Sequence, residues 1–236
     1  EGVISPRKGL PGIPETAEVI AVTRDLALIE QTGVRAHFSR LSTARAVQII
    51  SRAQYDGLPI TADVTAHHLH LTEMDVADYD PNAHVRPPLR TQRDRDGLRS
   101  GLMRGVVGAI CSDHQPHDLD AKLGPFSVTE PGISGLETLL PLALRLVGDG
   151  VVSLPQVIAA LTAQPARVLG LEVGALGLGA PGDVCIFDPE QQWTLEAEAL
   201  WSQGRNSPFL GWDFQGRVTH TLLEGRLVFE LETAVR

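Results

Sequence analysis

The sequence predicts an α/β fold for about its first 165 residues and a smaller β-rich part after them. Two observations predict the α/β part. Short apolar, β-branched runs alternate with helical patterns, and polar residues follow the ends of several of those runs. A third observation sets the rest apart, because from Gly170 onward short runs alternate between apolar and polar residues. Strand–helix alternation is typical of a parallel barrel or of a doubly wound sheet.

The first predicted helix lies between Pro14 and Gly33. Proline suits the first turn of a helix, the acidic Glu15 and Glu18 favour its positive end, and glycine suits its end. Its apolar residues recur at helical spacing: Val19, Val22, Leu26 and Ile29. The next elements are a strand at about 34–39 and a helix that Ser42 or Thr43 can cap and that runs to about Tyr55.

The remaining elements of the first part continue the alternation. We expect strands at about 60–65 and 106–112, and a short strand end at 85–89. Between and after them we expect a short helical piece from Leu71 and longer helices at about 91–104, 134–147 and 153–161.

The β-rich part contains four short runs that predict strands, at 184–187, 193–195, 218–223 and 226–229. Glu224 and Gly225 separate the last two runs, and a pair of this kind is typical of a tight hairpin. We therefore divide the chain into an α/β part over 1–169 and a β-rich part over 170–236.

The composition is that of an ordinary globular chain and bounds its partners. Of the 236 residues, 43% are hydrophobic and 21% are charged, and the formal net charge is −9, which argues against nucleic acid as a partner. No apolar run approaches the roughly 18 residues of a membrane span, and no signal peptide is visible. Cys111 and Cys185 lie far apart in apolar runs and are expected to be free thiols. We expect a cytoplasmic protein without membrane contact.

Candidate functional residues follow the ends of three predicted strands. They are Arg40 after the first strand, His67 and His68 after the second, and Asp113 and His117 after the strand at 106–112. Convergence of His and Asp from the carboxyl ends of parallel strands favours a metal site. There Asp113 can bind a metal and accept a proton from a metal-bound water, and His117 can reach an anionic group of a small substrate. The alternative is a polar turn that caps the next helix.

Short motifs spread over nearly the whole chain carry a family resemblance. They lie, in order, at 9–14, 41–43, 64–69, 87–90, 112–117 and 132–138, with weaker matches at 165–171 and 182–184. In this order they resemble the motifs of the long-chain dihydroorotases of the amidohydrolase superfamily. Each motif alone is weak, and the six in the correct order are much more specific.

The resemblance implies a (β/α)₈ TIM-type barrel, of which this chain would hold the later half, about strands five to eight, with a small C-terminal β-sandwich portion. It also implies a zinc site at the carboxyl ends of the strands. The implied reaction is the reversible cyclisation of N-carbamoyl-L-aspartate to dihydroorotate, a step of pyrimidine biosynthesis.

The resemblance also assigns roles to residues. Asp113 matches a metal ligand that is also the catalytic proton shuttle, and His68 matches a further metal ligand. His117 matches the residue that binds the substrate carboxylate, and Arg86 and Gly132 are expected to line the substrate site. The family implies one or two zinc ions, and we expect one here.

Three departures from the family pattern bear on activity. The His pair of the first strand and the bridging ligand of the fourth precede Glu1, so the chain is expected to be the C-terminal half of such a protein. Arg40 stands where the family has a ligand histidine, and a guanidinium has no lone pair for zinc. His37 lies three residues earlier, on the other face of an ideal strand. Arg86 stands where the family usually has asparagine, although it can still bind a carboxylate.

Three functions follow from these features. The first is a working one-zinc hydrolase of cyclic amides, which the presence of Asp113, His68 and His117 favours. The second is a non-catalytic dihydroorotase-like subunit that supports aspartate transcarbamoylase, which Arg40 and Arg86 favour. The third and weakest is a hydantoinase-type amidase. We lean slightly to the enzyme and expect a homo-oligomer. We also expect Arg40 to pair with an acid, and pairing with Asp113 would favour the non-catalytic subunit, because it occupies lone pairs that zinc needs.

Overall fold

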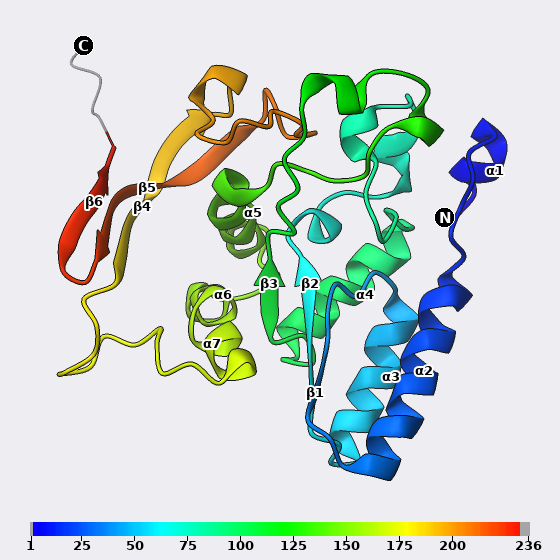
Figure 1. Cartoon of the computed structure of the whole chain (residues 1–236), viewed down its shortest axis with the longest axis horizontal. Coiled ribbons are helices and arrows are strands. Elements are labelled where there is room, and N and C mark those ends of the chain that lie inside the picture. The colour runs from blue at the N-terminus through cyan, green and yellow to red at the C-terminus, as the bar shows by residue number, and fades with distance from the viewer. Residues whose placement is uncertain (1, 232–236) are drawn as a thin grey trace.

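A three-stranded parallel sheet organises the first part of the chain in the computed structural model, which describes residues 2–231 (Figure 1). Its strands are β1 (Ala36–Phe38), β2 (Ile60–Thr65) and β3 (Ala109–Cys111), in the order β1-β2-β3. The register pairs Ala36 with Ile60 and Thr65 with Cys111. Parallel strands of this kind place their carboxyl ends at one edge, and the chain leaves each strand there.

Helices cover this sheet, and most of them begin at a residue that can cap them. The α-helices are α1 (Ile4–Lys8), α2 (Glu15–Thr32), α3 (Ala44–Tyr55), α4 (Gln92–Met103), α5 (Leu136–Gly148), α6 (Leu154–Leu161) and α7 (Ala163–Leu169). Thr43 caps α3 by accepting a hydrogen bond from the backbone N–H of Ala46 at 3.1 Å. Helix α3 packs between α2 and α4, and α6 packs on β3 (Figure 1).

Short 3₁₀ turns occupy the loops between the longer elements. They are η1 (His67–Leu69), η2 (Glu73–Val76), η3 (Pro81–Ala83), η4 (Leu119–Lys122), η5 (Phe126–Val128) and η6 (Ala197–Ala199). Turn η1 begins directly after β2, so it holds the histidine pair at the carboxyl edge of the sheet.

The core lies between the parallel sheet and its helices. Its fully buried side chains come from several elements: Ile50 on α3, Val64 on β2, Leu98 on α4, Val107 before β3, Leu146 on α5 and Val157 on α6. Burying a side chain of this size contributes roughly 1.5–3 kcal/mol. This apolar layer therefore gives the strand ends a rigid support.

The C-terminal part forms an antiparallel sheet of β4 (Val184–Thr194), β5 (Asp213–Leu223) and β6 (Arg226–Glu230), in that order. It lies beside α5, on the side away from the parallel sheet (Figure 1). A Cβ at Gly216 would overlap Leu144 of α5, so glycine permits this close packing. Glu224 and Gly225 both have positive φ, at 51° and 76°, which confirms the predicted hairpin turn.

The structure confirms the predicted strands at 34–39, 60–65 and 106–112, although each observed strand is shorter or equal in length. The expected strand end at 85–89 is wrong: this segment has no strand, because Pro87 and Pro88 lack the N–H that a ladder needs. Helices α1 and α7 were not anticipated. Among residues 2–231 the β-rich part is one sheet, and a second sandwich layer is not seen. The division at 169/170, with Arg236 and its neighbours outside the described residues, stays a prediction.

Candidate functional site

The carboxyl edge of the parallel sheet brings the predicted site residues from β1, β2 and β3 close together. The backbone N–H of Ala66 donates to the carbonyl of Cys111 at 2.9 Å, so the chain leaves β2 and β3 side by side. The N–H of Leu41 donates to the carbonyl of Asp63 at 3.1 Å, which brings the loop after β1 to the same edge. The edge is therefore a place where side chains of three loops meet.

Arg40 and Asp113 form an ion pair across this edge. Arg40 Nη1 lies 3.1 Å from Asp113 Oδ1, and the side chains are 43% and 13% exposed. Both residues have left-handed backbones, with φ of 59° and 44°, which costs a non-glycine residue about 1–2 kcal/mol. Gln115 Nε2 donates to the same Asp113 oxygen at 3.1 Å. The expected pairing of Arg40 with an acid is confirmed.

Asp63, on β2, holds the backbone of Arg40 in this conformation. Its Oδ1 accepts the backbone N–H of Arg40 at 2.7 Å, and its Oδ2 accepts Ser39 Oγ at 3.0 Å and contacts His37 Nε2 at 2.8 Å. Cys111 Sγ also donates to Oδ1, at 3.4 Å. Burial raises the pKa of Asp63, but the hydrogen bonds from His37, from the Arg40 backbone and from Ser39 outweigh it and leave the pKa lowered.

His37 takes part in this network through both ring nitrogens. Its Nδ1 lies 2.8 Å from Thr61 Oγ1, and its Nε2 contacts Asp63. Neither nitrogen is left for a metal, so His37 does not replace the histidine that the family has at position 40. The network was not predicted, although an aspartate inside the apolar run 60–65 was a visible signal.

His67 and His68 are both buried in turn η1, with ring centroids 4.8 Å apart. His68 Nε2 contacts the carbonyl of Pro88 at 3.3 Å and therefore donates, so its Nδ1 must accept from Thr65 Oγ1 at 2.6 Å. Burial lowers the pKa of His68 to about 4, so the ring is neutral near pH 7. Both of its nitrogens are nonetheless engaged.

His67 differs from its neighbour in one respect. Its Nε2 has no hydrogen-bond partner among the described residues. Burial first, then repulsion from the protonated form of His68 and from Arg40, lowers its pKa well below the ordinary histidine value. His67 is therefore a buried side chain with one ring nitrogen that makes no hydrogen bond among residues 2–231.

These contacts leave a poor site for zinc. The residues that the structure describes contain no group of three or more His, Cys, Asp or Glu side chains placed to hold a metal ion. His68 has no free lone pair, and Asp113 Oδ1 already accepts from Arg40 and Gln115. Asp113 Oδ2 has no hydrogen bond among residues 2–231, so the two predicted ligands offer one free oxygen, which is too few to hold a zinc ion without further ligands.

His117 and Gly132 lie together in the long loop after β3, where Asn206 connects them. Asn206 accepts the backbone N–H of His117 at 2.8 Å and donates to the carbonyls of Gln115 and Gly132 at 2.9 and 3.0 Å. His117 Nε2 contacts the carbonyl of Pro131 at 3.0 Å, which leaves Nδ1 for a ligand. A Cβ on Gly132 would lie 2.5 Å from Gln115 Cβ and 3.0 Å from His117 Nε2.

Lys122, which was not anticipated either, closes the same loop. Its buried Nζ donates to the carbonyls of Pro81, Glu130 and Gly132 at 3.0, 2.7 and 2.9 Å. Burial lowers its pKa to about 8, partly opposed by the charges of Asp80 and Glu130. Lys122 and Asn206 thus hold the segment that carries two predicted substrate residues.

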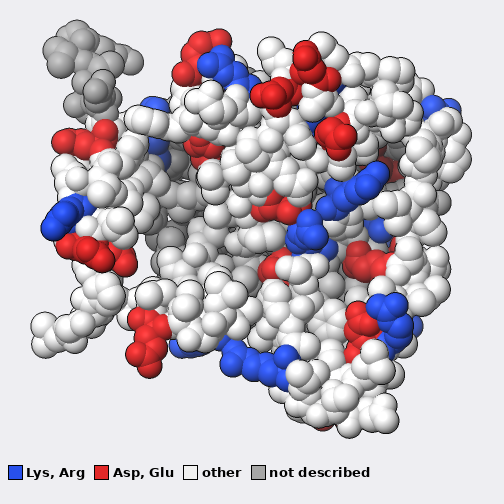
Figure 2. Space-filling model, in the orientation of Figure 1, with Lys and Arg blue, Asp and Glu red and all other residues white. Residues whose placement is uncertain are grey.

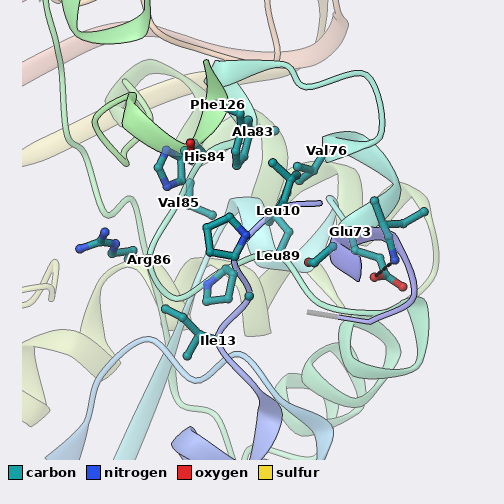
Figure 3. A pocket seen from close by; sticks show the side chains of 16 residues that line it. Leu10, Ile13, Glu73, Val76, Ala83, His84, Val85, Arg86, Leu89 and Phe126 are labelled. Atoms are coloured by element: carbon teal, nitrogen blue, oxygen red, sulfur yellow. Dashed lines mark hydrogen bonds between the residues drawn. The ribbon is translucent and has the colours of Figure 1, made fainter. Parts of the chain in front are cut away.

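Arg86 lies two residues before Pro88, whose carbonyl contacts His68. The Arg86 side chain is exposed and lines a pocket with Leu10, Ile13, His84 and Leu89, where the N-terminal segment meets the 83–89 loop (Figure 3). The residues that line this pocket do not include Arg40, His68, Asp113 or His117. Among residues 2–231 the Arg86 side chain makes no hydrogen bond or ion pair with Arg40 or Asp113, and its substrate role stays a prediction.

Two features concern partners. Figure 2 shows acidic and basic side chains interspersed over the face drawn, in keeping with a net charge of −9. No helix in the described range is long and apolar enough to cross a membrane.

Comparison with known proteins places these features in a family context. Residues 9–228 match the model of the Amidohydrolase family. The chain is 50% identical to a "Dihydroorotase-like protein" of Pseudomonas aeruginosa and 45% identical to a "Dihydroorotase" of Syntrophotalea carbinolica, and both alignments cover 98% of the chain and 54% of the relative. The solved structure of an L-hydantoinase (dihydropyrimidinase) from Arthrobacter aurescens matches 92% of the chain and 49% of its own length, with a TM-score of 0.86 and 28% identity. The chain spans about half the length of the curated relatives it matches.

Proposed function

Because the chain belongs to the amidohydrolase family, we propose that it is half of a dihydroorotase-like protein that serves pyrimidine biosynthesis as a non-catalytic subunit. One observation carries this proposal: an ion pair joins Arg40 and Asp113, the two residues that, by the family resemblance, match a ligand histidine and the catalytic aspartate. The similarity to a relative named dihydroorotase-like protein supports it.

The chemistry of the pair explains why catalysis would be lost. A guanidinium donates hydrogen bonds and cannot accept them, so Arg40 supplies no metal ligand. It also occupies an oxygen of Asp113, the residue that would accept a proton in hydrolysis. Position 68 is still a histidine, but the lone pair of its Nδ1 accepts a hydrogen bond from Thr65 Oγ1.

The second candidate is the hydrolase itself, which interconverts dihydroorotate and N-carbamoyl-L-aspartate. Relatives named dihydroorotase at 42–45% identity favour it, and so does the presence of Asp113, His68 and His117. In this candidate Asp113 moves the proton, and Arg86, His117 and Gly132 bind the anionic substrate. One zinc is held by Asp113 and His68 together with ligands from outside this chain. It requires the Arg40–Asp113 pair to open. A hydantoinase-type amidase with another cyclic amide is a weaker form of the same candidate.

Partners and location follow from the proposal. The rest of the barrel would come from the part of the protein that this chain lacks. A non-catalytic subunit needs an enzyme to support, and aspartate transcarbamoylase is the partner that the family resemblance suggests. We also propose a homo-oligomer in the cytoplasm that contacts neither nucleic acid nor membrane.

The test is a dihydroorotate hydrolysis assay on the full-length protein, with the Syntrophotalea carbinolica relative assayed in parallel as the positive control. We expect no hydrolysis above the uncatalysed rate, and co-purification with aspartate transcarbamoylase. Turnover in the usual enzyme range of about 1–10³ s⁻¹ would establish the second candidate instead. In that case Asp113→Ala should reduce the rate by several orders of magnitude, with the fold retained.

A further inference from the structure

The guanidinium of Arg40 makes only one of the hydrogen bonds that it could donate. A guanidinium has five N–H donors, and the one hydrogen bond seen for this group goes from Nη1 to Asp113. Within residues 2–231, Nε and Nη2 have no recorded partner, and the side chain is 43% exposed. One edge of a planar, permanently charged group therefore remains open to a ligand.

The position of this cation is built by the fold and is not that of a loose surface arginine. Asp63 accepts the backbone N–H of Arg40 at 2.7 Å and is itself bonded to Ser39 and His37. Asp63 lies on β2 and His37 on β1, while Cys111 of β3 adds a further contact to Asp63. All three strands of the parallel sheet thus contribute to holding Arg40 in a left-handed backbone.

A second group near this cation lacks a partner. His67 is 2% exposed, its ring feels the positive charge of Arg40, and its Nε2 has no partner in the described range. That nitrogen is buried, so the accessible donors here are those of Arg40, and the planar N–H donors of a guanidinium match the two oxygens of a carboxylate.

We propose that Arg40 binds a carboxylate of a small ligand without any metal, and that Asp63 is the residue that positions it. The ligand class rests on the proposed function: it is the carboxylate of dihydroorotate or N-carbamoyl-L-aspartate. Asp113 neutralises part of the charge of Arg40 and sets the plane of the guanidinium, while the free edge pairs with the ligand. The carboxyl edge of the parallel sheet would then keep a ligand-binding site while lacking the hydrolytic one.

Calorimetric titration of the full-length protein tests this, with a chelator present so that metal plays no part and N-carbamoyl-L-aspartate as the probe. We expect binding by the wild type and at least a tenfold weaker affinity for Arg40→Ala, because a charge-assisted pair is lost. Arg40→Lys should recover only part of the affinity, since an ammonium cannot form the bidentate pair. Arg45→Ala, an exposed arginine on α3, is the matched control and should bind like the wild type.

The role of Asp63 has its own readout. Asp63→Asn should weaken binding in the wild-type background and have no further effect in the Arg40→Ala background, because it acts through Arg40. If Asp63→Asn does not fold, Ser39→Ala, which removes one bond to Asp63, takes its place in the same cycle.

The outcomes separate this proposal from the proposed function. Absence of probe binding, or equal affinity for wild type and Arg40→Ala, overturns the carboxylate site whether or not the protein is an enzyme. Hydrolysis by the wild type overturns the non-catalytic role. It leaves the carboxylate site standing if Arg40→Ala still loses affinity in the presence of the chelator.

Discussion

Two regions hold the same edge of the sheet by opposite means. At the ends of β1 and β2 an anion, Asp63, collects donors from His37, Ser39 and the backbone of Arg40. In the loop after β3 a cation, Lys122, collects three backbone carbonyls. The first arrangement positions a charged side chain that is half open to solvent, whereas the second only fixes the path of the chain. The Asp63 region therefore exposes a charged group that a ligand can bind, whereas the Lys122 region only stabilises the loop.

The largest effect should come from removing the cation of the supporting region. Lys122→Met leaves three buried carbonyls without their donor, which should lower the free energy of unfolding of the full-length protein by about 3 kcal/mol or more. Urea unfolding measures it, and Lys8→Met, at a partly exposed position, is the control. A loss below about 1 kcal/mol would show that Lys122 does not hold the loop.

Removing the anion of the first region should cost less. Asp63→Asn keeps an oxygen for the Arg40 backbone and loses the charge-assisted contact with His37, so we expect a loss of about 1–3 kcal/mol. Urea unfolding is again the measurement. If Lys122→Met and Asp63→Asn cost the same, the proposed contrast between the two regions fails.

The pH dependence of stability should separate the two regions into two windows. Burial lowers the pKa of His68 from 6.5 to about 4, so the unfolded chain binds more protons between these values and stability rises with pH there. Burial lowers the pKa of Lys122 from 10.5 to about 8. The unfolded chain again binds more protons between these values, so stability also rises between pH 8 and 10.5. In unfolding curves across pH, His68→Gln should reduce the rise between pH 4 and 6.5, which His67 and His70 share, and Lys122→Met should reduce the rise between pH 8 and 10.5. A change in neither window contradicts the assignment.

The smallest effect on stability should come from the ion pair itself. Arg40→Gly removes a partly exposed pair worth about 0–1 kcal/mol and relieves a left-handed backbone that costs about as much. The net change should stay within about 1 kcal/mol in a thermal or urea melt, while carboxylate binding is lost. A loss above about 2 kcal/mol would assign the pair a structural role instead.

The Arg40–Asp113 pair could be predicted from sequence, whereas the Asp63 network that positions Arg40 and the contacts of the second region could not. Arg40 and Asp113 both follow strand ends, and parallel strands bring such ends together, so their pairing was foreseeable. Lys122 and Asn206 donate to backbone carbonyls of residues distant in the sequence, and a pattern of side-chain types cannot predict such contacts. The strand predicted at 85–89 fails for a local reason, because Pro87 and Pro88 have no N–H to donate to a neighbouring strand.

The histidine pair shows the limit of pattern reasoning in another way. The sequence indicates that His68 lies at the sheet edge, and it does. Whether its lone pair is free depends on Thr65 and on the carbonyl of Pro88, which only the folded chain brings into contact. A histidine at a matching sequence position is therefore weaker evidence for a metal ligand than the hydrogen bonds of its ring nitrogens in the folded chain.

The most direct test of the non-catalytic account is the zinc content of the full-length protein, purified from zinc-supplemented medium and measured by mass spectrometry. Because Arg40 supplies no ligand and bonds one oxygen of Asp113, and His68 has no free lone pair, the account predicts no bound zinc in the wild type and a higher content in Arg40→His. One zinc per chain in the wild type, with the same content in Arg40→His, would contradict it.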